Sequence, residues 1–211
     1  PINLTIFVQT GQDKTISEVI LNESAVKANI NLVQIDQLPL TFPMDEVIRK
    51  YHANPNPYFN PDKDTPLYCL LQCNKLALMN LAINDNYYNT EYFGWIDLGL
   101  SRLTNLSSLI KLEDWVKTKA RSLKRRVRFC LIKNTGLNAN SPRNLFYKLA
   151  HGYIVSGLFL GSAQAITRLS QLFNNEVVTC YQEGTITLEE KILMYLYTKY
   201  PQLFSLHFGD Y

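Results

Sequence analysis

The expected fold is decided by Glu91-Tyr-Phe-Gly-Trp-Ile-Asp-Leu-Gly-Leu-Ser-Arg102, in which an aromatic and aliphatic run ends abruptly on one carboxylate. The run predicts a buried strand, and Asp97 follows its carboxyl end. Open α/β sheets place ligands beyond strand ends of this kind. There Asp97 could hold a divalent cation, Gly99 lets the backbone come close, and Arg102 could meet a phosphate. The alternative is a structural Asp that caps the next turn.

Upstream of this stretch, the spacing of apolar residues predicts a β-α-β unit. Residues 4–9 are rich in β-branched side chains and favour a strand, 16–27 have helical spacing, and 31–35 favour a second strand. Two strands around a short helix indicate parallel pairing, which is typical of α/β proteins. Residues 45–52 then predict a short helix, and 54–66, with four prolines, predict irregular chain.

Residues 66–80 form the best predicted helix. Pro66 suits the first helical position, and Thr65 or Asp64 can cap the helix. Lys75 lies on this helix as a cation that could point at a phosphate. The alternative is a solvated surface lysine.

Downstream, strands and helices continue to alternate. The expected helices are 112–122, 162–173 and 187–200, and the expected strands are 127–133, 153–160, 177–182 and 204–208. We therefore expect a single α/β domain over residues 1–211, with a mostly parallel central sheet.

Several further residues have the chemistry of a binding or catalytic site. Gly157 and Gly161 flank a strand-to-helix turn as in phosphate-binding loops, but the Gly-Lys-Ser/Thr ending and the dinucleotide spacing are missing, so a P-loop is not predicted. Thr187-Leu-Glu-Glu190 matches a capping box, in which Glu190 bonds back to the cap residue. Glu189 has no such structural role and is free for catalysis. His207 and Asp210 lie near a strand end and could form one corner of a metal site.

Composition indicates an ordinary globular protein. Of the 211 residues 46% are hydrophobic and 18% are charged. The four cysteines are scattered, which favours reduced thiols in a reducing compartment. We see no leader sequence and no apolar run of membrane-spanning length, so we expect a cytoplasmic protein.

The charge is unevenly distributed, although the net charge is only +3. Residues 115–175 contain no Asp or Glu. The same stretch begins with a basic run: Lys117, Lys119, Arg121, Lys124, Arg125, Arg126, Arg128 and Lys133. Such a run is either a solvated face or an attraction for phosphate-rich ligands and anionic surfaces, such as the inner face of a membrane. Nucleic-acid binding is the least favoured partner class, because neither interleaved aromatics nor a known module is present.

Four motifs in the same order resemble the HtrL/YibB (WlaTC-like) family of bacterial proteins. They are Trp95-Ile-Asp-Leu-Gly99, Ser156-Gly-Leu-Phe-Leu-Gly-Ser162, Thr187-Leu-Glu-Glu190 and Gly209-Asp-Tyr211. The similarity covers about residues 64–211. That family is regarded as glycosyltransferase-like, so the resemblance implies the GT-A fold, which binds nucleotide-sugars.

The resemblance also implies a metal site. Asp97 corresponds to the Asp-x-Asp carboxylates that hold Mn²⁺ or Mg²⁺ in GT-A enzymes, but Gly99 replaces the second Asp. His207 or Asp210 corresponds to the late residue that completes the coordination of the metal. The segment 156–162, with its two glycines, corresponds to the floor beneath the donor and acceptor sugars.

Catalytic and donor-binding roles follow from the same resemblance. Glu189 or Glu190 corresponds to the carboxylate that acts as base on the acceptor hydroxyl or steadies the sugar cation. Charge on the departing diphosphate would be neutralised by a metal on Asp97 or by Lys75 and Arg102.

The implied function is transfer of a sugar from a nucleotide-activated donor to a glycan or a lipid-linked glycan. The alternatives are a non-catalytic relative that binds nucleotides or sugars, and a protein that binds anionic surfaces through residues 117–128. The family's first strand and its Asp- and Arg-containing turn have no counterpart here. We expect that this element either precedes Pro1 in a longer protein or is lost in this branch.

Overall fold

The computed structural model describes residues 3–9, 27–56, 59–97, 123–132, 136–148 and 154–208. The predicted helix at 112–122 and nearly all of that at 16–27 fall outside these ranges. Of the predicted site residues, Gly99, Arg102 and Asp210 also lie outside the described residues.

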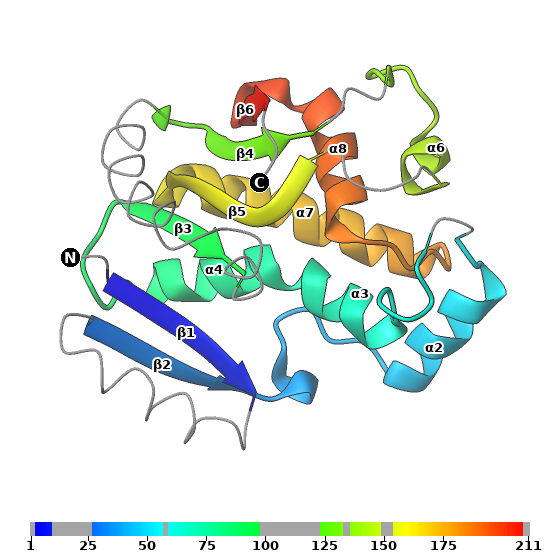
Figure 1. Ribbon diagram of the computed structural model, residues 1–211, viewed down its shortest axis with the longest axis horizontal. Coiled ribbons are helices and arrows are strands. Elements are labelled where there is room, and N and C mark those ends of the chain that lie inside the picture. Colours follow the sequence, from blue (N-terminus) through cyan, green and yellow to red (C-terminus); the bar gives the residue numbers. More distant parts are fainter. Residues whose placement is uncertain are drawn as a thin grey trace.

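The central sheet is mixed. Its order is β3 (Tyr92–Ile96), β5 (Ile154–Ser162), β4 (Val127–Leu131) and β6 (Phe204–Phe208). β5 runs antiparallel to β3 and to β4, whereas β4 and β6 are parallel (Figure 1). The α/β class is confirmed, but the expectation of a mostly parallel sheet is wrong. An apolar run looks the same whichever way the buried strand points, so strand direction was not encoded in the pattern.

A second sheet contains two strands, β1 (Asn3–Gln9) and β2 (Lys27–Val33). They pair in parallel, with Asn3 opposite Lys27, as the β-α-β pattern predicted. This sheet packs beside β3, because the ring of Phe7 stacks on that of Trp95 with centroids 6.5 Å apart.

The predicted helix at 66–80 is two helices. α3 (Pro66–Cys73) and α4 (Lys75–Asp85) meet at Asn74, whose side chain is fully buried. The Asn74 amide accepts a hydrogen bond from Leu40 N–H and donates to the carbonyls of Leu40 and Leu70. As predicted, Pro66 is at the first position of α3, and Thr65 caps the helix by accepting from Tyr68 N–H.

α7 (Ala163–Gln182) is 20 residues long. The predicted strand at 177–182 is therefore wrong, because that segment is the last part of α7. Val177 and Cys180 are both buried, three residues apart on one helix face, and this spacing gave the segment its apolar appearance. Ser162 caps α7 by accepting from Ala165 N–H.

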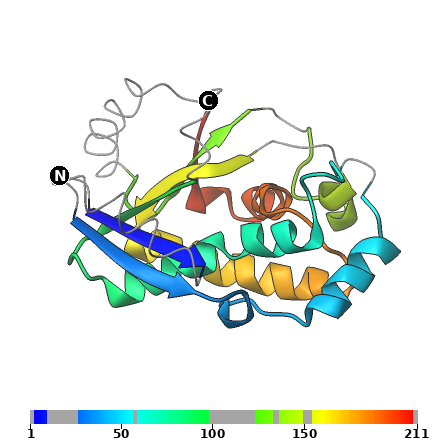
Figure 2. The ribbon, with the colours of Figure 1, turned by 60° about the horizontal axis from the view of Figure 1, so that its bottom comes forward.

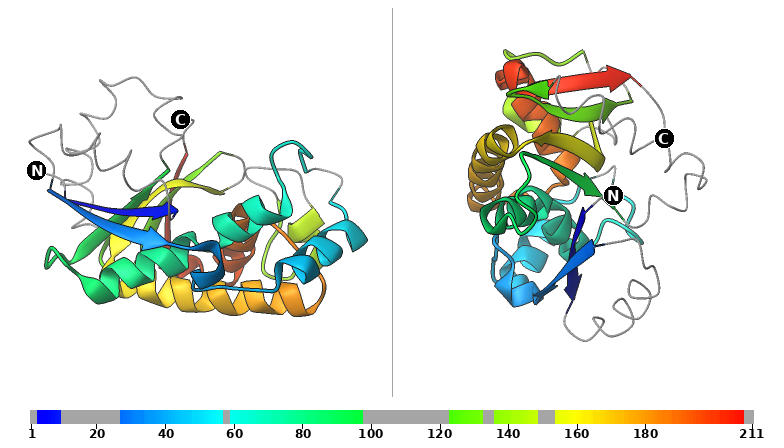
Figure 3. Two further views of the ribbon diagram at one scale, coloured as in Figure 1. Left: turned by 90° about the horizontal axis from the view of Figure 1, so that it is seen from below. Right: turned by 90° about the vertical axis from the view of Figure 1, so that its left-hand side faces the viewer.

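The remaining elements are short. They are η1 (Ile35–Gln37), α2 (Met44–Ala53), α6 (Arg143–Lys148), α8 (Glu189–Lys199) and η3 (Pro201–Leu203). The main core lies between the central sheet and helices α4, α7 and α8, where Phe129, Phe159, Phe173 and Ile192 are fully buried. Figures 2 and 3 show α4 and α7 side by side beneath the sheet. None of the described helices combines the length and apolarity needed to cross a bilayer.

Candidate functional site

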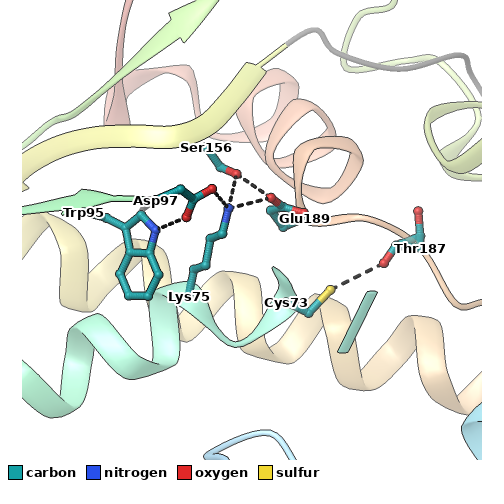
Figure 4. A network of polar contacts seen from close by, with 7 residues as sticks. All are labelled: Cys73, Lys75, Trp95, Asp97, Ser156, Thr187 and Glu189. Atoms are coloured by element: carbon teal, nitrogen blue, oxygen red, sulfur yellow. Dashed lines mark hydrogen bonds and ion pairs between the residues drawn. The ribbon is translucent and has the colours of Figure 1, made fainter. Parts of the chain in front are cut away.

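Lys75 connects residues from three different elements (Figure 4). Its Nζ donates to Asp97 Oδ2 at 2.8 Å, to Glu189 Oε1 at 3.1 Å and to Ser156 Oγ at 3.3 Å. A lysine ammonium has three donors, so all three are used. We call these four residues the Lys75 cluster.

Backbone structure places the three charged members of the cluster. Lys75 is the first residue of α4, directly after the break at Asn74. Asp97 follows β3, and its N–H donates to Gly157 O at 2.8 Å, which continues the pairing with β5. Glu189 is the first residue of α8, where the helix dipole favours a negative charge.

Secondary contacts orient the two carboxylates. Trp95 Nε1 donates to Asp97 Oδ1 at 2.6 Å, and Ser156 Oγ donates to Glu189 Oε1 at 2.5 Å. The side chains of Lys75 and Glu189 are each 7% exposed, whereas that of Asp97 is 32% exposed. Asp97 is therefore the charged member of the cluster that a ligand can reach most easily.

The Lys75 ammonium is held in its charged form. Burial alone would lower the pKa of Lys75, but the charges of Glu189 and Asp97 outweigh burial and raise that pKa. Lys75 is therefore not a proton acceptor, and its contact with Ser156 is not the pair of a nucleophile and its base.

Glu190, the next residue of α8, has different surroundings from Glu189. Burial first, and then the charge of Glu189, raise the pKa of Glu190 to about 7, although Lys75 and Lys63 oppose the shift. Within the described chain Glu190 makes no hydrogen bond or ion pair. It is thus a carboxylate that exchanges a proton near neutral pH.

The predicted capping box at Thr187 to Glu190 is wrong. The residue that precedes α8 is Leu188, and no side chain caps the helix there. The Thr187 carbonyl accepts from Cys73 Sγ at 3.5 Å, while its hydroxyl is buried without a hydrogen-bond partner in the described structure. Glu190 is therefore not committed to a cap.

Tyr68 on α3 is a neighbour of the cluster that sequence reasoning missed. Burial raises the pKa of the Tyr68 phenol, and the charges of four carboxylates raise it further. Those carboxylates are Glu189, Asp64, Asp97 and Glu190. Sequence reasoning also did not single out Ser156, although it lies in the segment predicted to underlie the sugars. No sequence signal relates Tyr68 to Lys75, because the break at Asn74 interrupts the helical period between them.

The two glycines predicted to bind donor lie in different surroundings. The Gly157 carbonyl accepts a hydrogen bond from the N–H of Asp97, at the end of β3. Gly161 lies in the core, where an added Cβ would come 3.1 Å from Ile166 Cγ1 and 3.2 Å from Val127 Cγ2. Gly157 is therefore next to the Lys75 cluster and Gly161 is not.

His207 is not brought to Asp97. It lies on β6, at the opposite edge of the central sheet from β3, with β5 and β4 between them. Strand spacing separates the two edges by roughly 14 Å. Among the residues that the structure describes, no group of three or more His, Cys, Asp or Glu side chains could hold a metal ion.

A family model described as "Bacterial protein of unknown function (HtrL_YibB)" matches residues 8–211. The chain belongs to the HtrL/YibB family. This confirms the resemblance drawn from the four motifs, and the match begins at residue 8 rather than near residue 64.

Comparison of this HtrL/YibB-family chain with curated proteins finds no match. Among solved structures, it is similar to that of mouse xyloside xylosyltransferase 1 in its apo form. The two chains are 14% identical, and the match covers 97% of this chain and 71% of the mouse chain with a TM-score of 0.43.

Proposed function

We propose that this chain is a glycosyltransferase, which moves a sugar from a nucleotide-activated donor to a glycan or lipid-linked glycan acceptor. The supporting observation is that Lys75 joins Asp97, 22 residues away, to Glu189, 114 residues away. Candidates from two separate motifs thus meet at one place beyond the end of β3. Sugar transfer requires a carboxylate near the reacting carbon and control of charge at the leaving group.

The two glutamates take different roles in this proposal. Glu190, with a pKa of about 7, accepts the proton of the acceptor hydroxyl near neutral pH. Glu189 is fixed by Lys75 and Ser156, so it orients the site. Asp97, the more exposed carboxylate, accepts hydrogen bonds from hydroxyl groups of the sugar.

The residues around Asp97 do not fit a divalent cation in the described part of the chain. The Lys75 ammonium already lies where the oxygens of Asp97, Ser156 and Glu189 converge. In the proposal, neutralisation of the charge on the leaving diphosphate therefore falls to Arg102, one of the two cations that the resemblance implied for it, and no step is derived through a metal.

Two alternative functions are each supported by a specific observation. A non-catalytic sugar- or nucleotide-binding protein is favoured because all three N–H donors of the Lys75 ammonium are used in hydrogen bonds within the protein. A protein that binds anionic surfaces is favoured because Lys124, Arg125 and Arg126 are exposed.

A panel of UDP-, GDP-, CDP- and dTDP-sugars tests the proposal by thermal shift and by release of the nucleotide. A donor at 100 times its dissociation constant should stabilise the fold by about 2.7 kcal/mol. Glu190→Gln should retain this binding and lose turnover by about 100-fold or more. Glu183→Gln, at the far end of α7, is the matched control and should keep both.

Each alternative has its own outcome. Binding of a donor without turnover, for every donor and acceptor tested, would mean that the chain is a binding protein and not an enzyme. Binding to anionic vesicles, abolished when Lys124, Arg125 and Arg126 are neutralised and unaccompanied by donor binding, would favour the surface-binding protein.

A further inference from the structure

We infer that the Lys75 ammonium is the resident cation of this site, so that the site binds its ligand without a divalent metal. The geometry of three converging oxygens, from the end of β3, from β5 and from the start of α8, points to this assignment (Figure 4).

The ammonium occupies the point on which these oxygens converge. Asp97 Oδ2, Ser156 Oγ and Glu189 Oε1 lie 2.8, 3.3 and 3.1 Å from Lys75 Nζ. Magnesium binds oxygen ligands at about 2.0–2.1 Å, so a metal held by the same three oxygens would need the same point. Metal and ammonium therefore exclude each other there.

The second oxygen of Asp97 has a partner as well. Trp95 Nε1 donates to Asp97 Oδ1 at 2.6 Å. A cation that approached from that side would have to displace the indole N–H. Both oxygens of Asp97, the more exposed carboxylate of the Lys75 cluster, thus already have a donor within the protein.

The charges lead to the same conclusion. One ammonium between two carboxylates leaves the Lys75 cluster with a net charge of −1 when both are ionised. Without Lys75, two carboxylates and a hydroxyl would face an open space, which is the hard oxygen donor set that Mn²⁺ and Mg²⁺ prefer. Shortening this lysine should therefore create a metal site that the natural protein lacks.

The indole of Trp95 reports on this position directly. Mn²⁺ broadens nearby NMR signals, so Mn²⁺ bound at Asp97 should broaden the Trp95 indole N–H signal far more than amide signals of β6, at the opposite edge of the sheet. Trp95→Phe identifies the indole signal. The probes are Mn²⁺ alone and Mn²⁺ with UDP, GDP, CDP or dTDP.

We expect no selective broadening in the natural chain and clear broadening in Lys75→Ala. Lys75→Met is the matched control, because it removes the charge but fills the space, and it should bind no Mn²⁺. Adding Asp97→Asn to Lys75→Ala should abolish the new binding. Urea unfolding of each variant establishes that it is folded before its titration is interpreted.

The Mn²⁺ titration of the natural chain tests the inference even if Lys75→Ala does not fold. Selective broadening of Trp95 in the natural chain, lost in Asp97→Asn, would overturn it. A folded Lys75→Ala that binds no Mn²⁺ would also overturn it, because these oxygens would then not converge on a cation position.

The prediction that Asp97 binds no metal does not depend on the proposed function. The prediction for turnover rests on the proposed function. If the chain transfers sugar, turnover should be unchanged when a chelator removes divalent cations. Loss of turnover with the chelator would contradict the inference but not the proposed glycosyltransferase activity. Absence of turnover under all conditions would contradict the proposed function, and the Mn²⁺ titration would still decide the metal question.

Discussion

At the scale of single residues, the two adjacent glutamates of α8 differ because only one has a partner. Glu189 is paired with Lys75 and hydrogen-bonded by Ser156. Glu190 lacks such contacts in the described structure, and burial raises its pKa to about 7. The sequence motif suggested the reverse, with Glu190 bound in a cap and Glu189 free. Pairing across 114 residues, rather than local helix chemistry, accounts for the difference between the two side chains.

The raised pKa of Glu190 predicts a specific dependence of stability on pH. Its ordinary pKa is 4.5, and the folded value is about 7. Because the folded state holds this proton more tightly, the favourable contribution is complete below pH 4.5 and is lost as pH rises through 7. Glu190→Gln should therefore gain stability relative to the natural chain between about pH 4.5 and 7, with no further gain above.

Urea unfolding of both proteins across this pH range measures the effect. The groups that act on Glu190 are Glu189, Lys75, Lys63 and Asp64, with the phenol of Tyr68 nearby. Because the variant retains them, their own titration largely cancels in the difference. A difference in unfolding free energy that stays constant with pH would show that Glu190 titrates normally.

At the scale of elements, the break between α3 and α4 brings Lys75 into the site. Asn74 binds both backbone groups of Leu40 and the carbonyl of Leu70, so the loop before α2 is fixed to the turn between two helices. In a continuous α-helix the Leu70 carbonyl would accept from the Asn74 backbone N–H, which here bonds to the Leu71 carbonyl instead. The buried amide thus determines where α4 begins.

We expect Asn74→Ala to destabilise the fold by roughly 2–5 kcal/mol, because it leaves the buried N–H and C=O of Leu40 without partners. The indole N–H signal of Trp95 should also shift, since Lys75 would move relative to Asp97. Asn80→Ala is the control. Among the described residues the Asn80 side chain makes one hydrogen bond, which it accepts from Thr167, and its loss should cost about 1 kcal/mol. A normal unfolding free energy for Asn74→Ala would refute this account of the helix break.

Gly161 is predicted to serve packing between β5, β4 and α7. In Gly161→Ala the new Cβ would press on Ile166 and Val127, which should cost about 1–3 kcal/mol of stability. That cost should shrink in a Val127→Ala background, where one of the close contacts is removed. Thermal and urea unfolding measure both. An unchanged stability with weakened donor binding would instead support the role that the resemblance implied.

At the scale of the whole molecule, the four thiols are protected by the fold. Cys69, Cys73, Cys130 and Cys180 are all buried. Burial raises the pKa of Cys69 to about 12 and that of Cys180 to about 11, with smaller contributions from neighbouring charges. Cys69, Cys73 and Cys180 also line an apolar cavity of about 30 Å³, between α3 and α7.

We expect these thiols to react with a disulfide reagent at pH 8 only when the protein unfolds. The thiolate is the reactive form, and both the raised pKa values and the burial suppress it. The labelling rate should therefore rise with urea in parallel with the unfolding transition, while the denatured chain reacts at once. Rapid stoichiometric labelling of the native chain would mean that the core opens locally around the cavity.

The sequence by itself determined much of the local structure and the family. It located strands near β1, β4, β5 and β6, the start of α3 with its proline and cap, and the carboxylate that ends β3. These features depend on neighbouring residues, because the period of apolar side chains and the chemistry of caps are local. The order of four motifs likewise sufficed to identify the HtrL/YibB family.

Only the tertiary structure decided how β5 runs, where the long helix breaks and which charges meet. Strand direction leaves no mark on an apolar pattern, and the break depends on bonds between Asn74 and a loop 34 residues away. The partners of Lys75 come from 22, 81 and 114 residues along the chain. Contacts of this kind arise when α4, α8 and the strands pack around one core, and no local property of Lys75 distinguished it from a solvated surface lysine.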